Sequence, residues 1–190
     1  MYKQQLLAME NIEKIFTIQW VGPFDTFDSL NEYLNDKNTC DKQLFSFYYC
    51  SGSKKGKGHP VSDKGFRYFG LHKAESAINK RVNRNHEHLS DFREPFSLWI
   101  GSFSDQSQQT PQNVEIVETA FISTYGDYLT ENTRKVNSRL PESICIINLW
   151  YKRDESRWAK KKTEIKLFDD VLTYEKESDT YSIGNLSRMI

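Results

Sequence analysis

Hydrophobic and polar residues follow one another in short blocks, and the period of each block predicts an element. Alternation with β-branched and aromatic residues predicts strands, whereas apolar spacings of three and four predict helices. The predicted strands are 16–21, 44–50, 66–71, 97–103 and 143–151, with two short ones at 171–174 and 181–183. The predicted helices are 27–34, 74–88 and 114–125. A Gly- and Lys-rich stretch at 51–60 predicts a flexible basic loop between two antiparallel strands.

The length and the charge of the chain limit the classes of protein to which it can belong. The 190 residues suit one domain with a buried core. The formal net charge is zero, from 26 basic and 26 acidic residues, so the chain as a whole lacks the charge typical of a nucleic-acid binder. Residues 53–93, however, hold ten Lys and Arg against four acids. This segment is a candidate polyanion site, and its alternative is a solvated charged face.

The three cysteines, Cys40, Cys50 and Cys145, have no metal-like spacing, and their odd number argues against a disulfide framework. The sequence shows no secretory apolar segment and no run of about 18 apolar residues. We therefore expect a soluble, cytoplasmic protein without a membrane partner.

Residue types that can take part in phosphodiester hydrolysis follow one another along the chain. Two tyrosine motifs come first, then a basic segment with imidazoles, then one carboxylate inside an apolar helical pattern. The residues are Tyr48-Tyr49, Tyr68-Phe69-Gly70, Arg81, His86, His88 and Glu118.

This order resembles the GIY-YIG nuclease domain over residues 20–137. Tyr68-Phe69-Gly70 is similar to the second motif of that family, and Arg81 follows Gly70 at the place of the catalytic arginine. The segment 117–122 resembles the helix that carries the metal-binding glutamate. The resemblance implies an α/β (α+β) fold with a small, mostly antiparallel central sheet flanked by helices. It also implies a catalytic core at 43–140, between a strand-helix extension at 1–42 and a C-terminal strand and charged extension at 141–190.

The first family motif is absent, because the strand reads Leu44-Phe-Ser-Phe-Tyr-Tyr-Cys50 without Gly-Ile-Tyr. Depending on the register, Ser46, Tyr48 or Tyr49 takes the place of the family tyrosine. Side chains alternate along a strand, so only one of Tyr48 and Tyr49 can face the Arg81 segment. The family asparagine is similarly open between Asn132 and Asn137.

The resemblance assigns roles to five residues. Glu118 would bind Mg²⁺ or Mn²⁺, and Arg81 would stabilise the charge on the phosphoryl oxygens. Tyr68 and Tyr49 (or Tyr48) would hold the attacking water or the phosphate. His86, with His88 as the alternative, could move a proton near neutral pH. Each residue also has an ordinary reading as a core or surface side chain.

Substrate contacts are expected from the basic loop and its surroundings. The candidates are Lys54, Lys55, Lys57, His72, Arg84 and Asn132. The predicted function is a divalent-metal-dependent endonuclease that hydrolyses phosphodiester bonds in DNA, with RNA left open. The alternatives are a catalytically inactive binding module for nucleic acid or protein, and an unrelated α+β protein in which Tyr-Phe-Gly occurs by chance.

Overall fold

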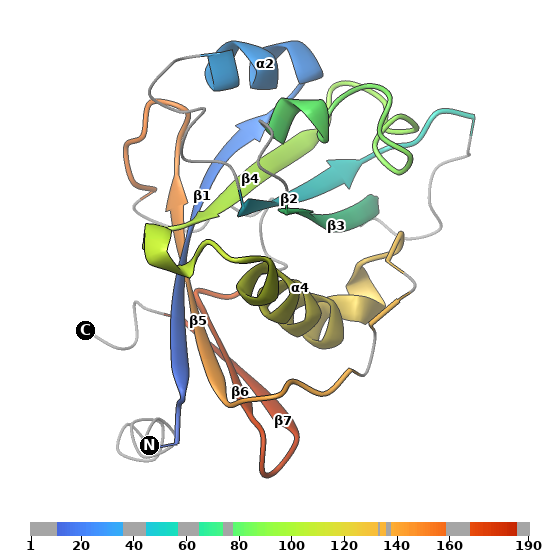
Figure 1. The fold of residues 1–190 in the computed structure, drawn as a ribbon. Helices are drawn as coiled ribbons and strands as arrows, with labels where there is room; N and C mark the ends of the chain where they lie inside the picture. The colour runs from blue at the N-terminus through green and yellow to red at the C-terminus, as the bar shows by residue number, and fades with distance from the viewer. Residues whose placement is uncertain are drawn as a thin grey trace.

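A seven-stranded mixed sheet dominates the computed structural model (Figure 1). The structure describes residues 11–35, 45–56, 65–73, 78–132, 134–135, 138–158 and 168–185. The strands run β1 (Lys14–Phe24), β2 (Phe45–Gly52), β3 (Phe66–Lys73), β4 (Ser97–Phe103), β5 (Ile144–Tyr151), β6 (Val171–Glu175) and β7 (Thr180–Gly184). The helices are α2 (Phe27–Asn35) and α4 (Pro111–Tyr125), with 3₁₀ turns η2 (Ile78–Lys80), η3 (Gln106–Gln108) and η4 (Gly126–Tyr128).

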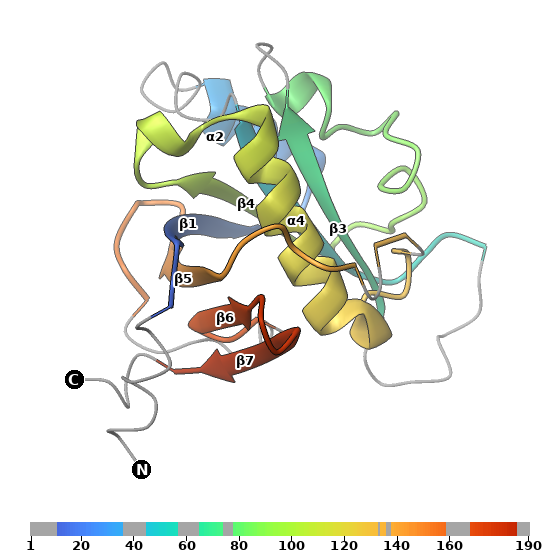
Figure 2. The ribbon, with the colours of Figure 1, turned by 60° about the horizontal axis from the view of Figure 1, so that its bottom comes forward.

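The order of the strands across the sheet is β3-β2-β4-β1-β5-β6-β7. Neighbouring strands are antiparallel except for β1 and β5, which run parallel over eight residue pairs from Lys14–Ile144 to Val21–Tyr151. The strand of the predicted N-terminal extension therefore lies in the middle of the sheet, between strands from the other two predicted segments. Figures 1 and 2 show the sheet curling, with α4 lying across its concave side.

The predicted fold class is therefore wrong. The prediction was a small, mostly antiparallel sheet flanked by helices, whereas the chain forms one large curled mixed sheet with two short α-helices among the described residues. The physical reason lies in the partners of β1. It pairs with β4 along one edge and with β5 along the other, so pairing extends the sheet from three strands to seven.

The predicted helix at 74–88 is also absent from the described part of that range, where η2 is followed by turns. The local cause is asparagine. The Asn83 side chain donates to the carbonyls of Asn79 and Lys80 at 3.0 and 2.8 Å and accepts from the Asn85 backbone N–H at 2.8 Å. Such side-chain to backbone hydrogen bonds offer the chain an alternative to helical pairing. The result is a loop that projects Arg81 and His86 from separate turns.

Each face of the sheet has its own core. On the α4 side, aromatic rings of the strands pack against Phe121 of the helix. On the other side, α2 and residues 78–96 cover a second cluster that includes Tyr48 and Tyr68. α4 begins at Pro111 because the Thr110 hydroxyl caps it by accepting from the Asn113 N–H at 3.2 Å. Among the described residues, no helix has the length and apolar character needed to cross a bilayer.

Candidate functional site

The alternation of β2 separates the two candidate tyrosines. Tyr48 points to the side covered by residues 78–96, whereas Tyr49 points into the α4-side core, where its ring packs against Phe168 at 4.8 Å. Burial raises the pKa of Tyr49 to about 12. Tyr48 is therefore the tyrosine that faces the Arg81 segment, whereas Tyr49, the tyrosine first expected there, faces the other side of the sheet.

Gly70 explains why the Tyr-Phe-Gly motif needs a glycine. Tyr48 and Gly70 are directly opposed in the β2–β3 ladder, and the Tyr48 ring lies across the glycine. A Cβ added at position 70 would overlap the ring and hydroxyl of Tyr48. The missing side chain therefore lets Tyr48 lie flat enough to approach Tyr68, whose ring centroid is 5.9 Å away.

His86 completes this group from the loop that follows η2. Its Nε2 lies 2.7 Å from the Tyr48 hydroxyl, and its Nδ1 accepts from the backbone N–H groups of His88 and Leu89 at 3.1 and 3.3 Å. The His86 ring also packs against Tyr68 at 5.7 Å. Both nitrogens of His86 are thus occupied inside the protein, so the histidine that sequence analysis proposed for proton transfer is held in place.

Burial governs how these groups ionise. It lowers the pKa of His86 to about 4, with help from the positive charge of Arg81. Burial also raises the pKa of Tyr48 far above its ordinary value, against the opposing effect of Arg81. The pKa of Tyr68 is raised by burial as well, although Tyr48 and the Arg81 charge oppose this rise. At neutral pH all three are neutral.

An exposed rim surrounds the buried group. Arg81 and Glu87 are exposed, and His88 is half-buried with its ring stacked on Tyr68 at 4.5 Å. We name Tyr48, Tyr68 and His86, with the rim residues Arg81 and His88, the Tyr–His cluster. It combines a buried neutral interior with an exposed cationic side chain beside it, which is an arrangement suited to an anionic ligand.

Glu118 belongs to α4, which packs on the opposite side of the sheet from this cluster, and its negative charge contributes to the raised pKa of Tyr68. Its carboxylate is already paired, however, because the Lys135 ammonium donates to it at 2.6 Å. Lys135 has a left-handed backbone (φ 66°), and its carbonyl accepts from the Ser123 hydroxyl at 2.8 Å. Within the described ranges, no three His, Cys, Asp or Glu side chains gather as a metal site would require.

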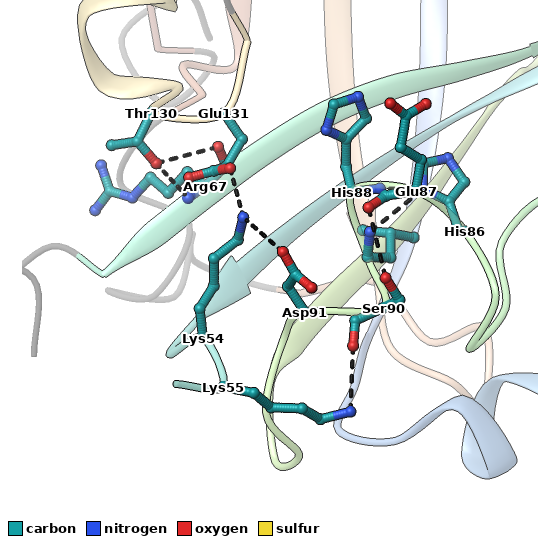
Figure 3. A network of polar contacts seen from close by, with 11 residues as sticks. Lys54, Lys55, Arg67, His86, Glu87, His88, Ser90, Asp91, Thr130 and Glu131 are labelled. Carbon is teal, nitrogen blue, oxygen red and sulfur yellow. Dashed lines mark hydrogen bonds and ion pairs between the residues drawn. The ribbon is translucent and has the colours of Figure 1, made fainter. Parts of the chain in front are cut away.

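Lys54, expected to contact substrate, is instead buried in a polar network shown in Figure 3. Its ammonium pairs with Glu131 at 2.5 Å and Asp91 at 3.6 Å and lies over the rings of Phe66 and Phe92. It therefore joins the end of β2 to the turn after His86 and to the segment that follows α4. This position makes Lys54 part of the framework that holds the Tyr–His cluster.

The other residues expected to contact substrate do not gather at the Tyr–His cluster. Asn132 covers the outer edge of β3, since its amide accepts from the Phe69 N–H at 2.9 Å and donates to the Phe69 carbonyl at 2.7 Å. Arg84 is exposed and pairs with Asp28 at 2.8 Å and Glu94 at 3.7 Å.

Lys55 is exposed, and its ammonium donates to the Ser90 carbonyl at 3.2 Å. His72 is buried on β3, opposite Ser46 in the ladder. Lys57 and Asn137 lie outside the described residues.

Sequence reasoning missed two residues of this region. Lys135 stands 17 positions after Glu118, and nothing in the pattern between them indicated the ion pair. The sequence pattern also assigns no role to Glu87, whose charge raises the pKa of Tyr68. Alternation along β2 indicates that Tyr48 and Tyr49 face opposite sides of the sheet. It does not indicate which side the Arg81 segment covers, so the sequence could not select Tyr48.

Comparison of the chain with protein-family models, with curated proteins and with solved structures finds no match.

Proposed function

We propose that this chain hydrolyses phosphodiester bonds in nucleic acid, with the Tyr–His cluster as its site. The observation that carries the proposal is convergence. Tyr68 of β3 and His86 of the segment after η2 both pack against Tyr48, and the charge of Arg81, from the same segment, acts on all three. The charge of Glu118 acts on Tyr68. The resemblance to the GIY-YIG domain assigns catalytic roles to Tyr68, Arg81, His86 and Glu118.

In this proposal Arg81 binds the scissile phosphate. Its guanidinium is exposed at the rim, and its charge reaches Tyr48, Tyr68 and His86. A fixed guanidinium at the phosphoryl oxygens stabilises the charge that develops during attack by water. Tyr68 stays protonated at neutral pH, because its pKa is raised, so its role is to donate a hydrogen bond to the phosphate.

His88 is the imidazole placed to receive a proton from the attacking water. It is half-buried and stacked on Tyr68, whereas both nitrogens of His86 have partners within the protein. The water oxygen attacks phosphorus, the bond from phosphorus to the leaving sugar oxygen breaks, and the leaving oxygen is protonated from solvent. An imidazole can act as a general base of this kind near neutral pH.

A Mg²⁺ or Mn²⁺ ion at Glu118 stays a prediction. Magnesium sites in phosphoryl-transfer enzymes often use one or two carboxylates and the substrate phosphate, so a single Glu can suffice. Glu118 would hold the ion only after its 2.6 Å pairing with Lys135 opened. When bound, such an ion neutralises charge on the phosphate.

The second candidate function is a nucleic-acid binding module without catalytic turnover. The ion pair between Glu118 and Lys135 favours it. Glu118 and Lys135 neutralise one another, and Arg84 and Lys54 are likewise paired with acids. A site of this kind can still bind a nucleic-acid backbone through Arg81 and Lys55, with an affinity that falls steeply as salt rises.

The test is cleavage of supercoiled plasmid, single-stranded DNA and single-stranded RNA with Mg²⁺, Mn²⁺ or EDTA. We expect Arg81→Ala and Tyr68→Phe to lower the rate by about 100-fold, because each removes a donor to the developing charge. Glu118→Ala reports on the metal and excludes a contaminating nuclease. Tyr49→Phe is the matched control, since Tyr49 faces the other side of the sheet, and it should cut like the wild type.

Absence of cleavage by the wild type on all three substrates would overturn the proposed function. Salt-sensitive binding without cleavage would then support the binding module. Equal rates for wild type and Arg81→Ala would show that any cleavage arises elsewhere.

A further inference from the structure

The two edges of the sheet differ in what covers them. At the β3 edge, residues 130–132 hydrogen-bond to the backbone of Arg67 and Phe69 at 2.7 to 3.0 Å. Within the described part of the chain, β7 pairs with β6 alone, and no other segment hydrogen-bonds to its backbone. Figure 2 shows β7 as the outermost strand at its end of the sheet. An uncovered edge offers free N–H and C=O groups to another strand.

β7 also lacks features that commonly keep an edge strand from pairing. Natural edge strands are often protected by charged side chains, by proline or by a bulge. β7 reads Thr180-Tyr-Ser-Ile-Gly184, with no charge and no proline, and its five pairs with β6 run without a shift in register. The strand is therefore open to pairing along its outer side.

An apolar row of the α4-side core crosses the sheet and ends at this edge. Its members are successive cross-strand partners on β1, β5, β6 and β7, namely Phe16, Ile146, Leu172 and Ile183. The first three are buried, whereas Ile183 is 53% exposed. Tyr181, two residues away on the same face, is half-buried and packs against the same core. The core thus reaches the open edge with two large side chains.

The backbone groups of the same two residues point outward. The carbonyl of Ser182 faces β6, because the Thr173 hydroxyl donates to it at 3.4 Å. Successive residues of a strand direct their N–H and C=O groups to opposite sides, so those of Tyr181 and Ile183 point away from β6. Tyr181 and Ile183 therefore present both hydrogen-bonding groups and apolar surface to a neighbouring strand.

We propose that the β7 edge is the interface between two copies of this chain, whose β7 strands pair antiparallel about a two-fold axis at Ser182. In this register, Tyr181 of each copy lies opposite Ile183 of the other, and each such pair exchanges two backbone hydrogen bonds. The side chains form an aromatic and β-branched cross-strand pair on each side of the axis. The apolar row that ends at Ile183 then continues into the core of the other copy.

The charges beside β7 select this antiparallel arrangement. Asp179 precedes the strand and Asn185 follows it. Two-fold pairing about Ser182 sets Asp179 of one copy opposite Asn185 of the other, so no like charges are opposed. Parallel pairing in register would set Asp179 against its own copy, and like charges directly opposite destabilise a sheet.

The covered β3 edge limits the assembly to a dimer. A two-fold contact uses the β7 edge of both copies, so the joined sheet has a β3 edge at each end, and residues 130–132 cover it. The Tyr–His cluster lies on β2 and β3, at the far end of the sheet from β7. The dimer therefore leaves the cluster uncovered, and the proposal is independent of the proposed function.

Amide hydrogen exchange of the wild type, followed by NMR, tests the register. A stable complex buries about 800 Å² on each partner and a short strand supplies only part of this, so we expect a Kd of about 10–100 µM. The amides of Tyr181 and Ile183 should then exchange about four-fold more slowly at about 1 mM protein than at about 20 µM. The Ser182 amide, which faces β6, should change little. Equal rates for Tyr181 and Ile183 at the two concentrations would overturn the proposal.

Sedimentation equilibrium of two lysine variants tests the surface. Ile183→Lys puts a charge on the open edge, and we expect it to raise the Kd of the dimer at least about ten-fold. Ile15→Lys is the matched control, since Ile15 is 47% exposed but lies on β1 in the middle of the sheet, and it should dimerise like the wild type. Circular dichroism checks that both variants fold. A wild type that stays monomeric at about 1 mM, or a Kd unchanged by Ile183→Lys, would overturn the proposal.

Discussion

Tyr48 and Tyr49 are consecutive residues of β2, yet the two faces of the sheet to which they point differ in chemistry. Tyr49 lies on the α4 side, in a core where Trp20, Phe69 and Phe121 pack ring against ring. Tyr48 lies on the opposite side, where its hydroxyl is within hydrogen-bonding distance of the His86 imidazole. Both tyrosines are buried, so burial alone does not mark a functional side chain.

What separates the faces is the element that covers them. The α4 side is covered by a regular helix whose backbone is satisfied internally, so its buried side chains, such as Phe121, serve packing. The opposite side is covered by turns, whose free backbone N–H groups are available to hold a ring such as His86. Irregular backbone beside a sheet thus supplies the polar groups that a functional site needs. Three predictions test this comparison.

Trp20→Ala should give the largest loss of stability. The ring is fully buried, stacks on Trp150 at 5.6 Å and donates to the Asn148 side chain at 2.8 Å. Its removal leaves a cavity and an unpaired amide, so we expect a loss of about 3–5 kcal/mol in the free energy of unfolding by urea. Ile15→Ala, on the same strand but 47% exposed, is the control and should cost under about 1 kcal/mol. Similar losses in the two variants would show that the α4-side core is not organised around Trp20.

The opposite face should respond to acid through His86. Its pKa is about 4 in the folded protein and about 6.5 when unfolded, so the unfolded chain binds one more proton between these values. The free energy of unfolding should therefore fall as pH drops from 6.5 to 4, by roughly 2 kcal/mol from this group.

Urea unfolding at several pH values measures this effect. In His86→Gln the decline over the same range should be shallower, because the remaining acids titrate as before and the buried imidazole is gone. Parallel curves for the two proteins would mean that His86 is protonated in the folded state.

Gly70→Ala should produce a smaller but local effect. A methyl group there overlaps the Tyr48 ring, so the ring must shift away from Tyr68, at a cost of about 1–3 kcal/mol. Gly184→Ala is the matched strand control, since its nearest neighbour would be the Val171 Cβ at 4.0 Å, and it should change stability by under about 0.5 kcal/mol. Tyrosine ring NMR should report movement of Tyr48 and not of Tyr49. Unchanged Tyr48 signals would contradict the close approach.

The sequence determined the local elements to a large extent. Strand 97–103 was predicted with the bounds that β4 has, and the helix at 114–125 corresponds to α4. These succeed because alternation and helical spacing record which side chains must be buried, and burial is a local demand on each segment. The helix predicted at 74–88 failed where Asn83 bonds the backbone, since apolar spacing does not register that competition.

The tertiary structure alone decided which strands are neighbours and which groups meet. The pairing of β1 with β5 joins residues about 130 positions apart, and nothing local in either strand specifies the partner. The same holds for Lys135 and Glu118, and for the Lys54 network. Sequence analysis named Tyr68, Arg81, His86 and Glu118 as residues with the right chemistry. The choice of Tyr48 over Tyr49 and the locked ring of His86 came from long-range contacts, because the direction of a side chain depends on what covers the strand.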